Sequence, residues 1–193
     1  MWEALGDRAI RFPRPAAVSA RAIVRAARAW PGVIDVVVAA HDVAVYFADA
    51  PSIDPARLAA LASASDDAEP PRELALRAIY DGPDLDDIAS SAGLTVADVI
   101  SLHASAIYTV DTMGFAPGFA YMTGLAPRLH LPRRSTPRTR VPANSIAIAA
   151  GYTAVYPFDS PGGWHLLGRV DGPRMFGPDG ALLRLGDLVR FTP

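Results

Sequence analysis

The chain has 193 residues, of which 51% are hydrophobic and 20% are charged, and its formal net charge is −2. This length suffices for one large or two small domains with buried cores, and the near-neutral charge argues against a general nucleic-acid coat. Cysteine and lysine are both absent, which excludes disulfides, thiolate metal sites, a cysteine nucleophile, a Schiff-base lysine and a phosphate loop of the GxxxxGK[ST] type.

The beginning of the chain predicts a small α/β domain. Residues 9–12 form a first strand, and Ser19 is a good N-cap for a helix that ends at about Trp30. Two β-rich runs, 33–39 and 43–47, then predict a hairpin.

A second helix follows, with Asp54 as its cap and Pro55 at its first position, and it runs to about residue 64. The order strand, helix, strand, strand, helix matches a ferredoxin-like layout. Residues 63–72 are acidic and contain prolines, which is typical of a linker. Residues 73–80 form a further strand that either closes the first sheet or begins the next domain. We place the domains at 1–72 and 73–193.

Two short helices are expected over 84–91 and 95–105. Gly93 suits the left-handed end of the first, and Thr95 with Asp98 approximates a capping box for the second. The pattern resembles a DNA-binding helix-turn-helix. However, the second helix exposes almost none of the side chains that read bases, and the aspartates of both helices would repel phosphate. We therefore expect a helical hairpin packed on the main domain.

From residue 106 onward the chain predicts β-structure. Many short strands separated by glycine and proline turns favour a closed or nearly closed antiparallel barrel. The strand candidates are residues 107–110, 145–149, 153–156, 164–170 and 188–191.

The stretch from Gly114 to Arg169 carries the functional signal. Residues 112–158 contain no Asp or Glu but hold five arginines, Arg128, Arg133, Arg134, Arg138 and Arg140. Prolines bracket four of them, and guanidinium forks suit carboxylate or phosphate groups. The arginines can equally pair with acidic groups of the N-terminal half or of a partner chain, so both interpretations stay open.

Two glycine-rich motifs flank these arginines. In Gly114–Tyr121 the aromatics stand around two glycines, so they either wall a pocket or fill a core turn, and Tyr121 with its polar tip is the better site candidate. In Ser160–Trp164 the glycines either aim backbone donors at an anion or form a plain hairpin turn. Ser160 does not lie in a GxSxG elbow, which argues against a hydrolase nucleophile.

The four histidines lack metal-ligand spacing, so we expect no metal site. A structural role is the default for each, and His103 is a candidate for acid–base chemistry because histidine titrates near neutrality. The first residues lack the apolar segment of a signal peptide, and no apolar run is long enough to cross a bilayer. We therefore expect a cytoplasmic protein.

Three motifs, in this order and spacing, resemble the allophanate hydrolase subunit 1 family: GFAPGFAYMTGL, PRRSTPRTRVPANSIAIAAGYTAVYP and SPGGWHLLGR. This family includes the B component of 5-oxoprolinase, the KipI inhibitor of a sporulation kinase, and the carboxyltransferase subdomain of urea carboxylase. The similarity is dense from about Tyr80 to Arg169. The resemblance implies an α+β fold, with a small N-terminal α/β domain and a C-terminal cyclophilin-like β-barrel.

The resemblance also implies a function. The chain is expected to be a subunit of an ATP-dependent amidohydrolase complex, which opens 5-oxo-L-proline to glutamate or acts on a related urea or amide compound. Its partner would be a second cyclophilin-like subunit, of the type found as allophanate hydrolase subunit 2 or as the C component of 5-oxoprolinase, and a third subunit can join them. ATP would be bound with or by a partner. The alternatives are a KipI-like inhibitor of a sensor histidine kinase and the carboxyltransferase component of a biotin-dependent carboxylase.

The candidate residues follow from motif position and from His103. The catalytic candidates are His103 and Tyr152, and the substrate-binding candidates are Gly118, Tyr121, Arg133, Arg138, Ser145, Tyr156 and Trp164. The chain departs from the family at Asn144, which replaces a usual glycine, and at Tyr152, where 5-oxoprolinase members often have glutamine. These departures favour the urea-carboxylase side and put oxoproline specificity in doubt. No amidase serine signature is present.

Overall fold

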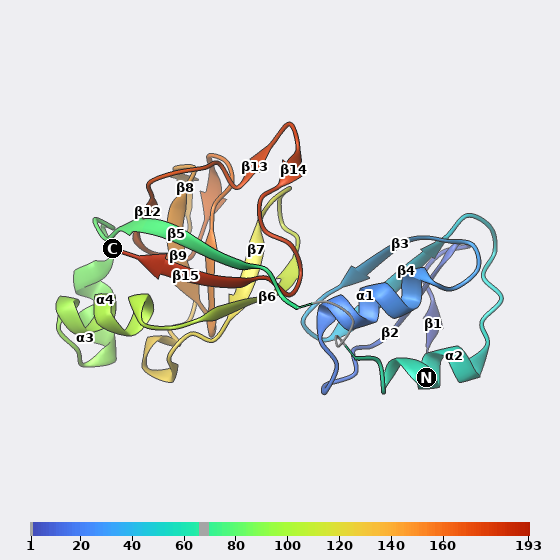
Figure 1. Ribbon diagram of the computed structural model, residues 1–193. Helices are drawn as coiled ribbons and strands as arrows, with labels where there is room; N and C mark the ends of the chain where they lie inside the picture. Colours follow the sequence, from blue (N-terminus) through green and yellow to red (C-terminus); the bar gives the residue numbers. More distant parts are fainter. Residues whose placement is uncertain (1, 66–69) are drawn as a thin grey trace. The chain divides into compact units, whose positions relative to one another are not determined.

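The computed structural model describes residues 2–65 and 70–193, which form two compact units, Met1–Pro70 and Pro71–Pro193 (Figure 1). The segment expected to be a linker contains the break between the units, and its residues 66–69 lie outside the described part of the chain. Each unit has a core of its own, so each is described separately.

Unit 1 is a four-stranded antiparallel sheet with two helices. The strand order is β1 (Glu3–Ala4), β2 (Ala9–Pro13), β4 (Asp42–Phe47) and β3 (Val33–Val38). Helix α1 (Ala20–Arg28) and helix α2 (Pro55–Leu61) begin where expected, because Ser19 and Asp54 each accept a hydrogen bond from a backbone N–H of the first turn.

The ferredoxin-like layout of unit 1 is incomplete. The neighbours β2, β4 and β3 stand in the order that this layout gives to its first three strands. The place beside β2, which a fourth strand after α2 would fill, is taken by the short strand β1. The sequence left two domains possible for the strand expected at residues 73–80. This strand, β5 (Glu73–Ile79), pairs on both edges with barrel strands and therefore begins unit 2.

Unit 2 is a closed seven-stranded barrel. Around the barrel the strands are β10 (Tyr152–Val155), β7 (Ala120–Thr123), β6 (Tyr108–Met113), β15 (Leu188–Thr192), β5, β12 (His165–Val170) and β9 (Ser145–Ala149). It closes because β10 pairs with both β7 and β9. The expected barrel is confirmed with one correction: β5 and β15 run parallel, so the barrel is mixed. Parallel neighbours need a long connection, and almost the whole of unit 2 lies between them.

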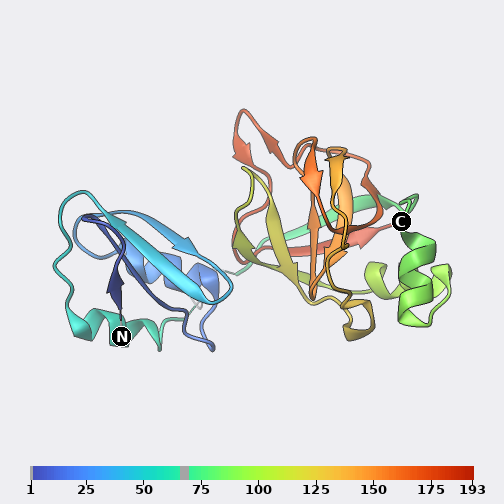
Figure 2. The same ribbon diagram turned by 180° about the vertical axis from the view of Figure 1, so that it is seen from behind.

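Shorter elements decorate the barrel. They are the paired strands β8 (Arg138–Val141) and β11 (Ser160–Gly162), the paired strands β13 (Phe176–Gly177) and β14 (Gly180–Ala181), and the 3-10 turn η1 (Pro127–Leu129). The expected helical hairpin consists of α3 (Leu85–Ala92) and α4 (Val96–Ala104), drawn in green at one end of the barrel in Figure 2. Gly93 is left-handed with φ 63°, and Thr95 and Asp98 form the complete capping box.

The hairpin buries an apolar face against the barrel. Ile88 and Val99 are fully buried in the cluster that also contains Phe191 of β15.

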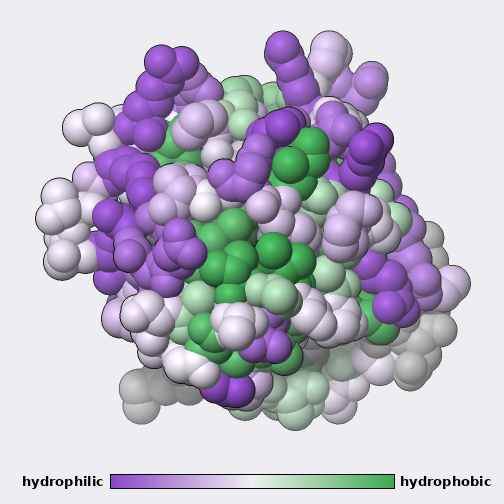
Figure 3. All heavy atoms as spheres, turned by 90° about the vertical axis from the view of Figure 1, so that its left-hand side faces the viewer, coloured by the Kyte–Doolittle hydropathy of each residue, from purple (hydrophilic) through white to green (hydrophobic). Residues whose placement is uncertain are grey.

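On the face of the molecule shown in Figure 3, a small group of hydrophobic residues is surrounded by hydrophilic ones. This pattern is ordinary for a folded surface.

Strand β9 separates two apolar clusters. All five of its residues are buried, because Ile146 and Ile148 belong to the main cluster inside the barrel, whereas Ala147 and Ala149 belong to a second, aromatic cluster. Successive side chains of a strand point to opposite faces, so the second cluster lies on the outer face of β9. This outer cluster carries the candidate site.

Candidate functional site

Five aromatic rings gather in the outer cluster. Phe119 stands at the centre, with its ring centroid 4.9 Å from Tyr121, 5.3 Å from Tyr156, 5.7 Å from Trp164 and 5.2 Å from Phe115, all in edge-to-face geometry. Edge-to-face pairs bring the positive edge of one ring onto the negative face of another and hold both rings in place. Four of these rings therefore pack into one wall, and Phe115, which is 62% exposed, stands at its edge.

The rings line a small pocket with a volume of about 100 Å³. Its lining residues are Phe115, Phe119, Tyr121, Arg133, Tyr156, Pro161, Gly162, Gly163 and Trp164. At Gly162 an added Cβ would lie 2.2 Å from the Tyr156 hydroxyl oxygen, so only glycine allows the backbone to approach that phenol. Gly162 and Gly163 of this turn line the pocket, and whether their backbone donors bind an anion stays a prediction.

Arg133 supplies the positive charge of the pocket. Among the residues that the structure describes, it forms no hydrogen bond or ion pair, and it is exposed. Burial raises the pKa of the Tyr121 and Tyr156 phenols, and this effect outweighs the nearby charge of Arg133, which lowers both pKa values. Both phenols therefore keep their protons at neutral pH and can donate hydrogen bonds to a ligand.

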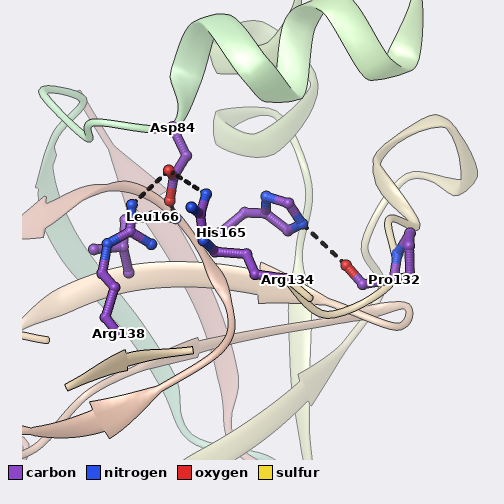
Figure 4. Close-up of polar contacts among 6 residues, drawn as sticks. All are labelled: Asp84, Pro132, Arg134, Arg138, His165 and Leu166. Carbon is purple, nitrogen blue, oxygen red and sulfur yellow. Dashed lines mark hydrogen bonds and ion pairs between the residues drawn. The ribbon is translucent and has the colours of Figure 1, made fainter. Parts of the chain in front are cut away.

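The neighbouring arginines are bound to one buried carboxylate (Figure 4). Asp84 is 1% exposed; its Oδ1 accepts from Arg134 Nη1 at 2.9 Å and from Arg138 Nη2 at 2.6 Å, and its Oδ2 accepts from the Leu166 N–H at 2.7 Å. Burial alone would raise the pKa of the Asp84 carboxyl. The hydrogen bonds from Arg138 and Leu166 and the charges of both arginines outweigh burial and hold that pKa below its usual value.

The remaining arginines of the acid-free stretch also have partners. Arg140 binds Asp159, and Arg128 donates to the carbonyls of Ala92 and Gly93 at the end of α3. Of the two interpretations that the sequence left open, structural pairing therefore applies to four of the five arginines, and Arg133 alone of the five lines the pocket.

Comparison with known proteins assigns the family. The family model described as "Carboxyltransferase domain, subdomain C and D" matches residues 4–181. The chain belongs to this family. The resemblance drawn from the three motifs is thereby confirmed.

Several known proteins are similar to this carboxyltransferase-domain chain. A protein of Escherichia coli O157:H7, named as the B component of 5-oxoprolinase, is 46% identical over 115 residues, which are 58% of this chain and 52% of the relative. The crystal structure of TTHA0988 superposes with a TM-score of 0.75 at 36% identity, covering 96% of this chain and 39% of that one. The chain thus spans about half the length of the curated relatives it matches.

A more distant structure supports the fold. The urea carboxylase of Kluyveromyces lactis is 19% identical, with a TM-score of 0.70 over 100% of this chain and 21% of that chain. At this identity the likeness concerns the fold, which agrees with the mixed barrel of unit 2.

The structure brings four of the nine predicted site residues of the carboxyltransferase domain into one pocket: Tyr121, Arg133, Tyr156 and Trp164. Two more lie beside it. Gly118, at φ 82°, precedes Phe119 and packs against Phe176, and the Tyr152 ring lies 5.9 Å from the Tyr121 ring, centroid to centroid. Arg138 is held by Asp84, and Ser145 is buried in β9, so neither of them lines the pocket.

His103 lies in the barrel core, away from the pocket. It is 0% exposed, and its ring centroid is 4.8 Å from Phe191 and 5.1 Å from Tyr108. Its Nδ1 is 2.8 Å from the Tyr80 hydroxyl and its Nε2 is 2.9 Å from Thr153 Oγ1, whose own proton goes to the Ala147 carbonyl. Thr153 therefore accepts from Nε2–H, and Nδ1 accepts from Tyr80.

This surrounding leaves His103 no route to a substrate. Burial lowers the pKa of His103 to about 3, so the ring is neutral at physiological pH. Its catalytic assignment, like the other site assignments, stays a prediction, and the geometry favours the structural role.

Sequence reasoning missed Asp84 as a member of the site. The signal was weak, because the DGPDL segment before α3 resembles an ordinary helix start, and Asp84 meets its arginines only across 50 and 54 positions of sequence. No group of three or more metal-ligating side chains occurs in residues 2–65 and 70–193. Within those same residues no helix is both long and apolar enough to cross a bilayer.

Proposed function

We propose that the chain is a subunit of an ATP-dependent amidohydrolase complex of the 5-oxoprolinase type, which opens 5-oxo-L-proline to L-glutamate or acts on a related urea or amide compound. The observation that carries the proposal is Arg133, a guanidinium without a protein partner among the described residues, at the edge of an aromatic pocket. The curated relatives at 42–46% identity, all named as the B component of 5-oxoprolinase, support the same activity.

The pocket suits a small flat carboxylate. The guanidinium of Arg133 would bind the carboxylate through a bidentate pair of hydrogen bonds. The rings of Phe119 and Trp164 would flank the ligand ring, and the protonated hydroxyls of Tyr121 and Tyr156 would donate to the amide carbonyl. These groups bind and orient; none of the described lining residues is Asp, Glu or His. The acid–base groups would therefore come from a partner.

The pocket does not fit ATP. Its volume of about 100 Å³ lies well below the roughly 300–1,000 Å³ typical of ligand pockets. We propose that a second, cyclophilin-like subunit, of the type that forms the C component of 5-oxoprolinase, joined by a third, binds ATP and completes the site. A cytoplasmic complex agrees with this nucleotide requirement.

A second candidate is carboxyl transfer. The family model, which is named for a carboxyltransferase domain, favours it. In this case the same pocket would hold a urea-like acceptor, and the carboxyl donor would be a carrier-bound biotin. The two candidates differ in their product, which the assay below separates.

Reconstitution tests the proposal. The full chain is mixed with the other subunits of a 5-oxoprolinase, and ATP-dependent glutamate release from 5-oxo-L-proline is measured. We expect turnover in the wild type. In Arg133→Gln we expect apparent affinity to fall about 10- to 100-fold, because hydrogen bonds to charged groups contribute about 1.5–3 kcal/mol.

Two variants sharpen this test. Arg133→Lys keeps the positive charge but cannot make the bidentate hydrogen bonds of a guanidinium, so its apparent affinity should lie between those of the wild type and Arg133→Gln. Arg140→Gln removes an arginine of the same stretch that pairs with Asp159 outside the pocket, and it should behave as the wild type. No glutamate release by an otherwise active mixture contradicts the hydrolase proposal, and carboxylation of urea in its place would support the second candidate.

A further inference from the structure

Two of the chain segments that line the pocket have no covalent connection near the site. One is the proline-bracketed segment that carries Arg133, and the other is the Pro161–Trp164 turn with the start of β12 that follows it. Backbone and side-chain hydrogen bonds join them: Arg134 N–H donates to the Gly163 carbonyl at 2.8 Å, and His165 Nε2 donates to the Pro132 carbonyl at 2.9 Å. The position of Arg133 over the pocket therefore depends on how firmly these segments are held.

Asp84 holds both segments at once. Its carboxylate binds Arg134 and Arg138, which follow Arg133 in the first segment, and the backbone N–H of Leu166, two residues after Trp164 in the second. Figure 4 shows these donors converging on the one carboxylate from different parts of the chain. No other acidic residue is among the described partners of Arg134 and Arg138.

The ordinary role of an aspartate at this position does not explain the arrangement. Asp84 precedes the first residue of α3, where aspartate commonly caps a helix by accepting an N–H of the first turn. Its side chain makes no such bond. The carboxylate instead accepts hydrogen bonds from donors of the two segments.

Among the described residues, Asp84 supplies the only negative charge that pairs with Arg134 and Arg138. The guanidinium groups of Arg134 and Arg138 share it, and the side chains of these residues are only 29% and 25% exposed. Without the carboxylate, two like charges would stand together with little solvent, which is unfavourable. The segment would then move outward, and Arg133 would move with it.

We propose that Asp84 is a positioning residue of the pocket, which fixes Arg133 and the Gly163–Trp164 wall relative to each other through Arg134, Arg138 and the Leu166 N–H. The proposal rests on the pocket being the ligand site put forward above. Asp84 itself does not line the pocket and touches no ligand.

Trp164 reports on the pocket directly. It is 5% exposed, and the other two tryptophans, Trp2 and Trp30, lie in unit 1. In a full-length chain with Trp2→Phe and Trp30→Phe, acrylamide quenching of the remaining fluorescence measures the exposure of Trp164. We expect Asp84→Asn, which keeps the side-chain volume and one acceptor, to raise the quenching constant about twofold or more, because a local opening exposes the ring.

A matched control separates positioning from general loosening. Asp187 is also a buried carboxylate, 3% exposed, and it also binds an arginine, Arg72, and a backbone N–H, but it lies at the start of β15 outside the pocket. Asp187→Asn should lower stability without changing the quenching of Trp164 in the folded protein. Equal rises in both variants would overturn the proposal.

A second variant covers the case in which Asp84→Asn fails to fold. Arg138→Gln leaves the Asp84 charge paired with Arg134 and should raise the quenching constant by a smaller amount. When both single variants fold, the double variant should change it by less than the sum of the two, because they act on one cluster. An unchanged quenching constant in Arg138→Gln and in any Asp84→Asn protein that folds contradicts the proposal.

A titration of the reconstituted complex with 5-oxo-L-proline keeps the two proposals distinguishable. If the complex with the wild-type chain does not respond, the proposed ligand is wrong, while the quenching comparison on the chain still decides the role of Asp84. If the wild type binds, we expect Asp84→Asn to bind at least about tenfold more weakly, as expected when a charged contact is misplaced. Unchanged affinity and unchanged quenching together would leave the ligand assignment standing and refute the positioning role.

Discussion

The buried histidine of the barrel makes unit 2 sensitive to mild acid. In the folded protein burial lowers the pKa of His103 to about 3, whereas the unfolded chain has the ordinary value of 6.5. The unfolded state therefore binds the proton first, and the free energy of unfolding falls as the pH decreases from about 6.5 toward 3. The slope is about 1.4 kcal/mol per pH unit, so between pH 7 and pH 5 the loss is about 2 kcal/mol.

His103 and the carboxylates change the free energy of unfolding in different pH ranges. Asp84, Asp98 and Asp159 also have lowered pKa values, and their stabilising effect is present above the ordinary value of 3.8 and is lost only as the pH falls further. Between pH 7 and pH 5 these groups stay ionised in both states, so they contribute little to the change.

The assay is urea unfolding at pH 7 and pH 5, followed by the fluorescence of Trp164 in the chain that lacks the other two tryptophans. His103→Gln keeps a polar group in the core but cannot titrate, so it should be less stable at pH 7 and lose about 2 kcal/mol less than the wild type on going to pH 5. His41→Gln, a substitution at an exposed position of unit 1, should keep the wild-type slope. Equal pH dependence of the wild type and His103→Gln would refute this reasoning.

Three further substitutions test local features. Gly162→Ala should lower the free energy of unfolding by about 1–3 kcal/mol, because the added Cβ meets the Tyr156 hydroxyl. Gly172→Ala should be nearly neutral, because no atom lies within 4 Å of an added Cβ at that position. Equal effects of the two substitutions in urea unfolding would contradict the close approach at Gly162. Ala150→Gly should raise stability by about 0.5–1 kcal/mol, since the native φ of 49° is unfavourable for alanine, and a lower melting temperature would argue against that strain. Thr95→Ala removes half of the capping box and should cost about 1 kcal/mol in the same assay; an unchanged midpoint would mean that the α4 cap contributes nothing.

Local signals were sufficient for the helices and for much of the barrel. Caps at Ser19, Asp54 and Thr95 depend on residues within one turn, so their patterns are complete in the sequence. Strands β9 and β12 carry apolar residues between turn signals, and the structure places them within one or two residues of the expected bounds.

The short strands of the site could not be predicted in this way. Strands β8 and β11 consist of RTRV and SPG, which have neither apolar alternation nor length, and they exist because they pair with each other. Likewise, β6 continues past Val110 to Met113 through a register shift against β7. Pairing across distant sequence decides these elements, as it decides the contact of Asp84 with its arginines.

The parallel pair of β5 and β15 has a consequence for synthesis on the ribosome. Leu188 pairs with Glu73, and the nearby Arg72–Asp187 contact spans 115 positions, so β5 is made long before the strand that covers one of its edges. At about 5–20 residues per second, the delay is roughly ten seconds. During that time the nascent barrel presents an open edge to other chains, and its closure is a late event in folding.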